Sequence, residues 1–275
     1  MRNRSRVSPP KRPRARPEPD GAPQRWQPRA ALGIAALLLA GCGDERHRIG
    51  DKPEAIEYIG ERRVRVGLCD WGADLELIDD MEDGSRKIPV VHGRSGLWFS
   101  FNDLTPDAQH TPRPGGGVFP FAELDPPRGH SALAVYTQGS EFGEWGGGVG
   151  VDLNGKDPYD ASRYAGIAFF ARAGGDRPLA MRANVSDRNT APAGLVCDEN
   201  VKDSCFAHHG FDFLLTEEWE AFAAEWGELD QKLMSVDIPP APLTRDALFE
   251  IQFQTEGELD FEFWIDDVAF LCHPL

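Results

Sequence analysis

Apolar and polar residues alternate in short segments along most of the chain beyond residue 66. In the last segment, LDFEFWIDDVAF at 259–270, the apolar residues Phe261, Phe263 and Ile265 follow the period of two that a half-buried β-strand shows. About eight such strands, separated by turn residues and not by strong helices, predict an all-β jelly-roll β-sandwich of two antiparallel sheets. The other segments are 97–102, 133–135, 149–153, 167–171, 179–185 and 249–253.

Three stretches depart from this strand pattern. Residues 103–130 are rich in proline and glycine, and residues 186–211 are polar, so both are predicted to be long loops. Residues 216–233 have a composition compatible with a short helix near 217–226, although 219–223 also suits a strand. The sequence leaves these two alternatives open.

Two carboxylates, Asp266 and Asp267, interrupt the alternation of the last strand. A second acidic segment, DDMED at 79–83, follows another apolar run near 75–78. Because carboxylates within an apolar strand need a partner, we hypothesise that the two segments meet around a cation and that the first and last strands are neighbours. Calcium suits such a site, since it takes about six to eight oxygen ligands.

The first 41 residues have the pattern of an export signal. Arginine-rich sequence precedes an apolar run at 30–40 that is too short to cross a bilayer, and the run ends in Leu-Ala-Gly-Cys at 39–42. This resembles the bacterial lipoprotein signal, which implies removal of 1–41 and acylation of Cys42. We expect a flexible tether at 42–66, a domain at 67–275, and an exported protein anchored to the outer membrane or cell surface only through its lipid.

Four cysteines remain beyond Cys42, and an even number in an oxidising compartment fits two disulfides. Cys197 and Cys205 lie eight residues apart in a polar loop, whereas Cys69 and Cys272 flank the segments proposed to be neighbours. We therefore predict the pairs Cys197–Cys205 and Cys69–Cys272. A zinc site is the alternative, but the spacing matches no Cys-x-x-Cys pattern.

Charge is distributed unevenly along the chain. The net charge is −16, but residues 1–41 hold nine basic and two acidic residues, so the remainder holds 20 basic and 43 acidic residues. Such a domain repels nucleic acid and anionic membrane surfaces and suits neutral ligands or divalent cations. An acidic surface that serves solubility alone is the other interpretation.

The segments LIDDMEDG at 77–84 and FWIDDVAF at 263–270 together resemble the galactose-binding-like jelly rolls that include calcium-containing carbohydrate-binding modules. RGHSAL at 128–133 and YAGIAFF at 164–170 resemble further strands of such modules. The resemblance covers about residues 75–272 and implies a β-sandwich with structural calcium. The same fold also carries protein-docking domains, so the resemblance specifies the ligand less well than the fold.

The resemblance also implies calcium ligands. In the family the early ligand follows a bulky apolar residue, which corresponds to Glu82, and the late ligand is one of the paired aspartates. Strand alternation places Asp267 on the side of the apolar residues, so Asp267 is preferred and Asp266 is the second choice. Asp80 and Asp125 are further candidates. The alternative is that most of these acids are turn and edge residues that face water.

Sugars bind to aromatic faces and to planar amide, carboxylate or guanidinium groups. Alternation in 97–102 assigns Phe99 and Phe101 to the core and Trp98 to the outer face, and Trp145 beside three glycines either presents a flat ring or packs under a loop. An ordinary solvated strand face contains similar residues. The candidate ligand-binding residues are Trp98, Asn102, Trp145, Arg172, Arg182, Asn184, Asp187, His208 and Gln252.

No nucleophile elbow, zinc-protease helix or phosphate-binding glycine loop occurs in the sequence. The many carboxylates make a pair suited to glycoside hydrolysis an unspecific signal. We therefore predict a monomeric, non-catalytic module that binds a carbohydrate polymer or oligosaccharide and no nucleic acid. A protein-interaction or structural module is the alternative, followed by a glycan-active enzyme.

Overall fold

The computed structural model describes residues 55–59, 62–201, 204–232, 240–255, 257 and 259–273, which form two β-sheets and four short 3-10 helices. The predicted all-β sandwich is thus confirmed. The signal segment 1–41, Cys42 and the first part of the expected tether lie outside the described residues. Within the described part, no helix is long and apolar enough to span a membrane.

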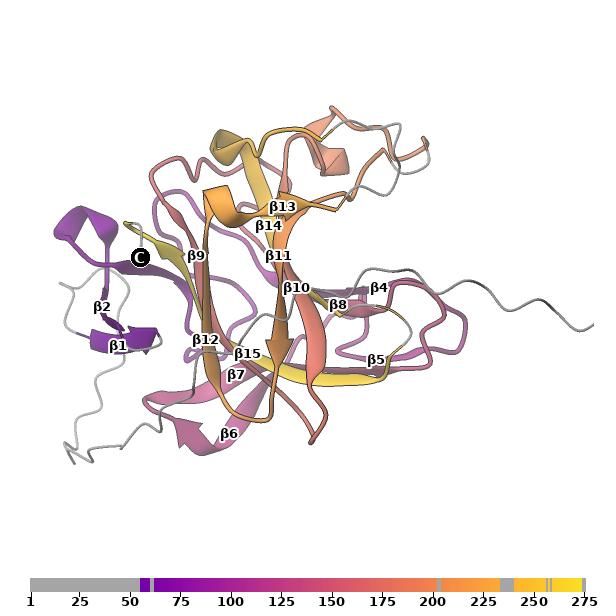
Figure 1. Cartoon of the computed structure of the whole chain (residues 1–275), viewed down its shortest axis with the longest axis horizontal. Coiled ribbons are helices and arrows are strands. Elements are labelled where there is room, and N and C mark those ends of the chain that lie inside the picture. The colour runs from indigo at the N-terminus through magenta and orange to yellow at the C-terminus, as the bar shows by residue number, and fades with distance from the viewer. Residues whose placement is uncertain are drawn as a thin grey trace, which may run out of the picture. The chain divides into compact units, whose positions relative to one another are not determined.

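Strand β15 (Phe261–Leu271) organises the nine-stranded sheet (Figure 1). Along one edge it pairs first with β7 (Ser131–Ser140) and then with β3 (Leu75–Asp79), and along the other edge it pairs with β9 (Gly166–Ala173). The first and last strands of the predicted domain are therefore neighbours, as expected. The other strands of this sheet are β1 (Ala55–Ile59), β2 (Arg62–Val66), β5 (Gln109–Thr111), β6 (Phe121–Arg128) and β12 (Glu220–Glu225).

The six-stranded sheet has the order β13-β11-β10-β14-β8-β4. Every pairing within it is antiparallel. Its strands are β4 (Trp98–Asn102), β8 (Gly147–Asp152), β10 (Leu179–Asp187), β11 (His209–Leu215), β13 (Asp230–Gln231) and β14 (Leu248–Thr255).

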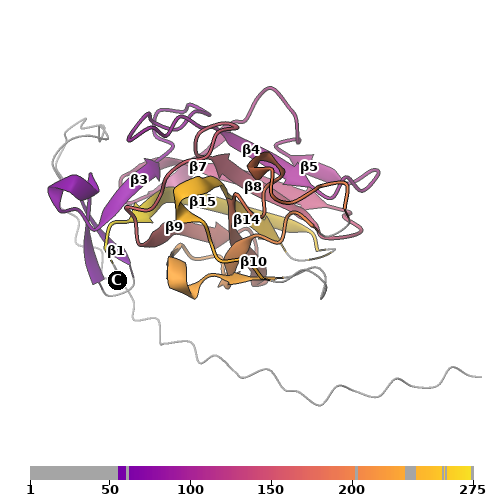
Figure 2. The ribbon, with the colours of Figure 1, turned by 90° about the horizontal axis from the view of Figure 1, so that it is seen from above.

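The two sheets pack face to face around one apolar core (Figure 2). Phe169 of β9 and Phe253 of β14 meet across the sheets with ring centroids 4.8 Å apart. Val149, Ile251 and Ile265 are fully buried beside them. Since these residues alternate with outward-facing ones along each strand, each sheet presents a separate outer face.

Both predicted disulfides are present. Cys69 and Cys272 are bonded with Cα atoms 5.2 Å apart across a sequence separation of 203, and Cys197 is bonded to Cys205 in the loop after β10. The first bond ties the start of the domain to the end of β15.

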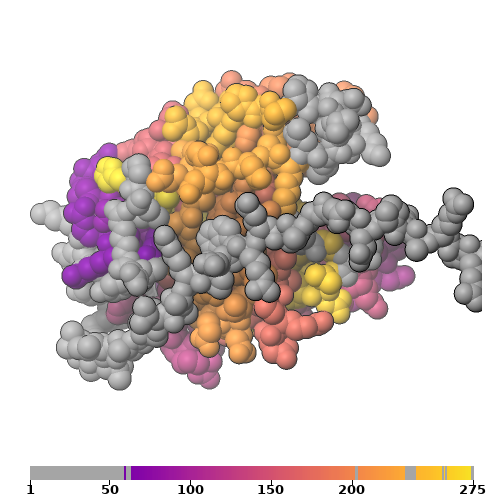
Figure 3. All heavy atoms as spheres, viewed as in Figure 1, coloured from indigo at the N-terminus to yellow at the C-terminus, as the bar shows by residue number. Residues whose placement is uncertain are grey.

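Three expectations about local structure change. The loop expected at 103–130 contains the strands β5 and β6, both of which pair with β7. A flexible tether was expected throughout 42–66, but residues 55–59 and 62–66 form the β1–β2 hairpin. Val64 of this hairpin is buried beside Leu75 and Ala269. At 217–226 the strand alternative is realised as β12, because Phe222 packs on Phe169 with ring centroids 5.5 Å apart. In the space-filling view, the orange segment that includes β12 forms the centre of the visible face (Figure 3).

Candidate functional site

The outer face of the six-stranded sheet carries polar side chains aligned across neighbouring strands. In one row, Arg182 on β10 lies between Asp212 on β11 and Gln254 on β14. Gln254 in turn pairs with Gly148 on β8, which pairs with Phe101 on β4. The row thus leads from charged groups through an amide and a glycine to an aromatic ring.

A second row lies beside the first and also leads through amides and a glycine to an aromatic ring, but it contains no charged group. Asn184 on β10 pairs with Gly210 on one side and with Gln252 on the other. Gln252 pairs with Gly150, which pairs with Phe99. We call the outward residues of these two rows, together with the adjacent Trp145, the polar platform, which consists of Phe99, Phe101, Trp145, Arg182, Asn184, Gln252 and Gln254.

Aromatic rings form one end of the polar platform. Trp145 is 41% exposed and stacks on Phe101 with centroids 6.1 Å apart and planes 28° from parallel. Phe99 lies beside Phe101 at 6.0 Å. A Cβ atom on Gly150 would come within 2.7 Å of the Phe99 ring, so glycine is needed there for the ring to lie over β8. No side chain therefore rises from β8 between the rings and the amides.

A hydrogen-bond network holds the other end. Arg182 donates to Asn184 Oδ1 at 3.0 Å, to Asp212 Oδ1 at 2.8 Å and to Asp230 Oδ1 at 2.6 Å. Asn184 Nδ2 donates to Gln254 Oε1 at 3.1 Å. Burial opposes ionisation of Asp212, but hydrogen bonds from Lys232 and Arg182 outweigh it and lower the pKa of this carboxyl. The network fixes the amides in defined orientations.

Two carboxylates lie at the edge of the platform. Glu250 on β14 pairs in register with Asp152 on β8, and Gln252 Nε2 donates to Glu250 Oε2 at 2.6 Å. Burial raises the pKa of Glu250, and the nearby Asp152 charge adds to this effect against the hydrogen bond from Gln252. These groups can accept hydrogen bonds from hydroxyl groups of a ligand on the platform.

Four of the predicted ligand-binding residues belong to the platform, namely Trp145, Arg182, Asn184 and Gln252. The prediction for Trp98 is wrong, because this side chain is fully buried and its Nε1 donates to Asp79 Oδ2 at 2.7 Å. Alternation gives the period of a strand but not which of its two faces is buried.

The remaining predicted residues lie elsewhere. Asp187 and His208 are buried, and both bond to Thr190 within the loop after β10, so they do not form an exposed rim. Asn102 ends β4, where its Oδ1 accepts a hydrogen bond from the Leu104 backbone at 3.1 Å. Arg172 lies on β9, in the other sheet.

Phe99 and Phe101 are platform residues that the sequence reasoning assigned to the core. Gly148 and Gly150 are the available signal for their true position. Two glycines at alternate positions of a strand leave one face of that strand without side chains, and large rings from the neighbouring strand can then lie over it.

The predicted calcium ligands already accept hydrogen bonds from protein groups. Arg128 donates to Asp266 Oδ2 at 2.8 Å and also to Asp267. Asp266 is fully buried, and this burial raises its pKa against the opposing charge of Arg128. The guanidinium group thus supplies positive charge between the paired aspartates.

Glu82 Oε1 accepts hydrogen bonds from the backbone N–H groups of Ala132 at 2.8 Å and Leu133 at 2.9 Å. Asp80 accepts one from the Glu82 backbone, and Asp125 is exposed. Among the described residues, no three Asp, Glu, His or Cys side chains converge as a metal site. As placed, these residues do not form a calcium shell, and calcium binding by them stays a prediction.

Comparison with known proteins gives structural neighbours only. No family model and no curated protein matches the chain. Several of the neighbours are carbohydrate-binding modules of the β-sandwich type, and another is an exo-β-agarase. A family 11 carbohydrate-binding module from Clostridium thermocellum, in complex with a β-1,3-1,4-mixed-linked tetrasaccharide, is 14% identical with a TM-score of 0.47, over 72% of this chain and 95% of that one.

Two further neighbours are similar to a lower degree. The family 11 module of the cellulosomal cellulase Lic26A-Cel5E of Clostridium thermocellum is 12% identical with a TM-score of 0.42, over 72% of this chain and 94% of that one. The CBM22-1 xylan-binding domain from Paenibacillus barcinonensis Xyn10C is 12% identical with a TM-score of 0.36, over 64% and 92%. Likeness at this level assigns neither a ligand nor a site to this chain.

Proposed function

We propose that the polar platform binds an oligosaccharide or polysaccharide without catalysing a reaction on it. The observation that carries this proposal is the alignment of two rows in which amides and a guanidinium group lie beside half-buried phenylalanine rings and the 41% exposed Trp145, with Arg182 and Asn184 each 5% exposed. Rings pack against the C–H faces of sugars, and planar polar groups bond pairs of hydroxyls. Because the network around Arg182 is already formed, little side-chain ordering opposes binding.

The charges of the platform favour an uncharged glycan. Arg182 is compensated by Asp212 and Asp230, and Glu250 adds negative charge at the edge. An acidic polymer would find no uncompensated cation in this network. We further propose that the protein is an exported, lipid-anchored monomer; the two disulfides support an oxidising compartment.

Affinity electrophoresis of the full chain in gels that contain soluble mixed-linked β-glucan, xylan or galactan tests this function. We expect at least one neutral polymer to retard the protein. Trp145→Ala and Gln252→Ala should each weaken binding about tenfold or more, corresponding to about 1.4 kcal/mol per tenfold. Trp71→Ala, which removes a 49% exposed tryptophan outside the platform, is the matched control and should bind normally.

Absence of retardation in every neutral polymer would reject the proposal. Equal binding by the wild type and both platform variants would show that the binding site does not lie on the outer face of this sheet. Release of reducing ends from a bound polymer would indicate hydrolysis, and loss of that release in Glu250→Gln would assign it to the platform edge.

A further inference from the structure

The outer face of the nine-stranded sheet carries a row of planar side chains on three adjacent strands and at the residue before a fourth. Trp264 on β15 pairs in register with Tyr136 on β7 and with Arg172 on β9, and Trp219, which immediately precedes β12, lies beside Arg172. The Trp264 ring lies 4.9 Å from the Tyr136 ring, and the Arg172 guanidinium lies 4.2 Å from Trp264 and 5.4 Å from Trp219. We call these four residues the aromatic row.

Some hydrogen-bond donors of the aromatic row have no acceptor in the part of the chain that the structure describes. Arg128 and Arg182 each contact carboxylates, whereas the side chain of Arg172 has no hydrogen bond or ion pair with a described residue and its Nε is buried without a partner. The Nε1 atoms of Trp219 and Trp264 likewise have no acceptor in the described part of the chain and are not among its buried unpartnered atoms. These indole donors are therefore not fully buried.

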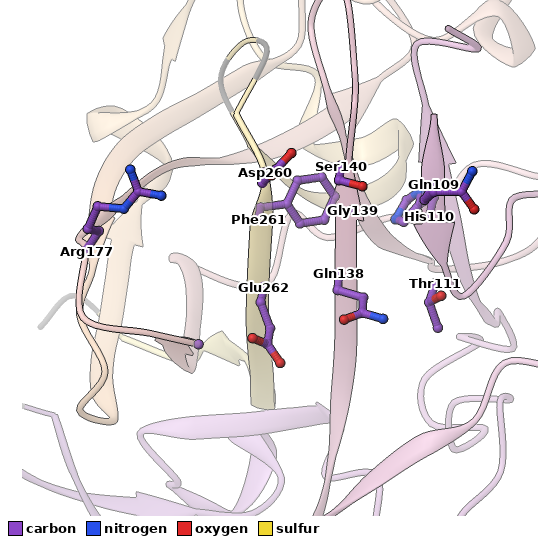
Figure 4. Close-up of a pocket in the computed structure, with 11 residues that line it drawn as sticks. Gln109, His110, Thr111, Gln138, Gly139, Ser140, Arg177, Asp260, Phe261 and Glu262 are labelled. Atoms are coloured by element: carbon purple, nitrogen blue, oxygen red, sulfur yellow. The ribbon is translucent and has the colours of Figure 1, made fainter. Parts of the chain in front are cut away.

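A hollow of about 410 Å³ adjoins the row where β5, β7 and β15 run side by side (Figure 4). Gln138 and Glu262 project from neighbouring strands, and Arg177 lies on the loop beside them. The Tyr136 hydroxyl lies 2.9 Å from both Glu262 Oε1 and Gln138 Oε1, so it connects the row to the hollow. The hollow thus offers amide and carboxylate acceptors beside the donors of the row.

We propose that the aromatic row and this hollow form a second saccharide-binding site, on the opposite outer face of the sandwich from the polar platform. The volume falls within the ~300–1,000 Å³ usual for small-molecule sites. The site combines donors, acceptors and aromatic surface, as hydroxyl-rich ligands require.

Charge identifies the class of ligand. Arg172 and Arg177 balance Asp260 and Glu262 within the site, and the chain as a whole is acidic. An uncharged oligosaccharide therefore fits better than an acidic one. This site does not depend on the platform, but with both faces active one molecule would hold two glycan chains and gain avidity on a polymer surface.

A glycan array tests the second site separately. The full chain with both Trp145→Ala and Gln252→Ala has a weakened platform, and we expect it still to bind at least one neutral oligosaccharide. In this background Arg172→Gln should weaken the residual binding tenfold or more. Trp264→Phe, which keeps an aromatic ring in the row but removes Nε1, should weaken it about threefold, and Trp71→Ala should leave it unchanged.

Melting temperatures close to that of the parent show that the variants are folded. The proposal is overturned if the platform-deficient protein binds nothing on the array, or binds only acidic glycans. Residual binding that Arg172→Gln and Trp264→Phe leave unchanged would also overturn it, as would a dimer that buries this face. If only the platform proposal is wrong, the wild-type protein should still bind a glycan. Trp145→Ala should then leave that binding unchanged, and Arg172→Gln should weaken it.

Discussion

Single buried polar side chains fasten the loop between β10 and β11. Asp187 precedes this loop and accepts hydrogen bonds from the hydroxyls of Thr190 at 3.0 Å and Thr244 at 2.5 Å. His208 ends the loop, and its Nδ1 lies 2.9 Å from Thr190 Oγ1. Removal of one partner would leave a buried group unpaired at a cost of about 1–3 kcal/mol. These buried residues hold the loop in place.

The buried His208 makes stability depend on pH. Burial lowers its pKa from 6.5 to about 4, so between these values the unfolded chain binds more protons than the folded one. Stability is therefore retained above pH 6.5 and falls as the pH decreases toward 4, by up to about 1.4 kcal/mol per pH unit from this group. His208→Gln should flatten the dependence in urea unfolding measured between pH 4 and 7.

His110, whose pKa burial also lowers to about 4, remains in this variant, so some dependence should persist. His273→Gln, at an exposed position, is the control and should follow the wild-type curve. Coincident curves for wild type and His208→Gln would show that His208 does not titrate on unfolding.

At the scale of one element, the side of β15 that faces the core switches at a β-bulge. Phe263 and Ile265 face the core before the bulge, and Val268 and Phe270 face it afterwards. Asp267 is the extra residue, with a φ of 45°. It is therefore not on the side of Phe263, as strict alternation had predicted.

Deletion of Asp267 should turn Val268 and Phe270 away from the core. Loss of two buried apolar side chains costs on the order of 3–6 kcal/mol, so we expect the deletion variant to unfold at much lower urea concentration or not to fold. Asp267→Gly keeps the extra residue and suits the positive φ, so it should lose only the side-chain contacts of Asp267. Similar midpoints for the two variants would contradict this role of the bulge.

The sequence predicted strands well and their orientation less well. Alternation located β4, but tertiary partners decided that Trp98 faces inward, since its indole N–H meets Asp79 and its ring stacks on Phe253. On β10, Arg182 and Asn184 lie opposite the core residues Met181, Ala183 and Val185, as alternation predicted, although each is only 5% exposed. The burial of Asp187 depends on Thr244, a distant residue that periodicity does not reveal.

At the scale of the whole molecule, two disulfides constrain the unfolded chain to different extents. The Cys69–Cys272 bond closes a separation of 203 residues and the Cys197–Cys205 bond one of eight. Loop-closure entropy predicts stabilisation of about 5 kcal/mol for the long loop and about 2.5 kcal/mol for the short one. Replacement of both cysteines of each pair by alanine should therefore lower the denaturant midpoint more for the long pair, and the reverse order would contradict the entropic account.

The Cys69–Cys272 bond also determines which part of the chain bears a force applied to the two ends of the domain. Tension applied between the chain before Cys69 and the chain after Cys272 passes through a single covalent bridge, because the two sulfur atoms join the points of entry and exit. The strands between them, including those that carry the polar platform, lie outside the path of the force. Under oxidising conditions the disulfide closes the domain into a covalent loop, so a force applied to its two ends would leave the spacing of the polar-platform residues unchanged.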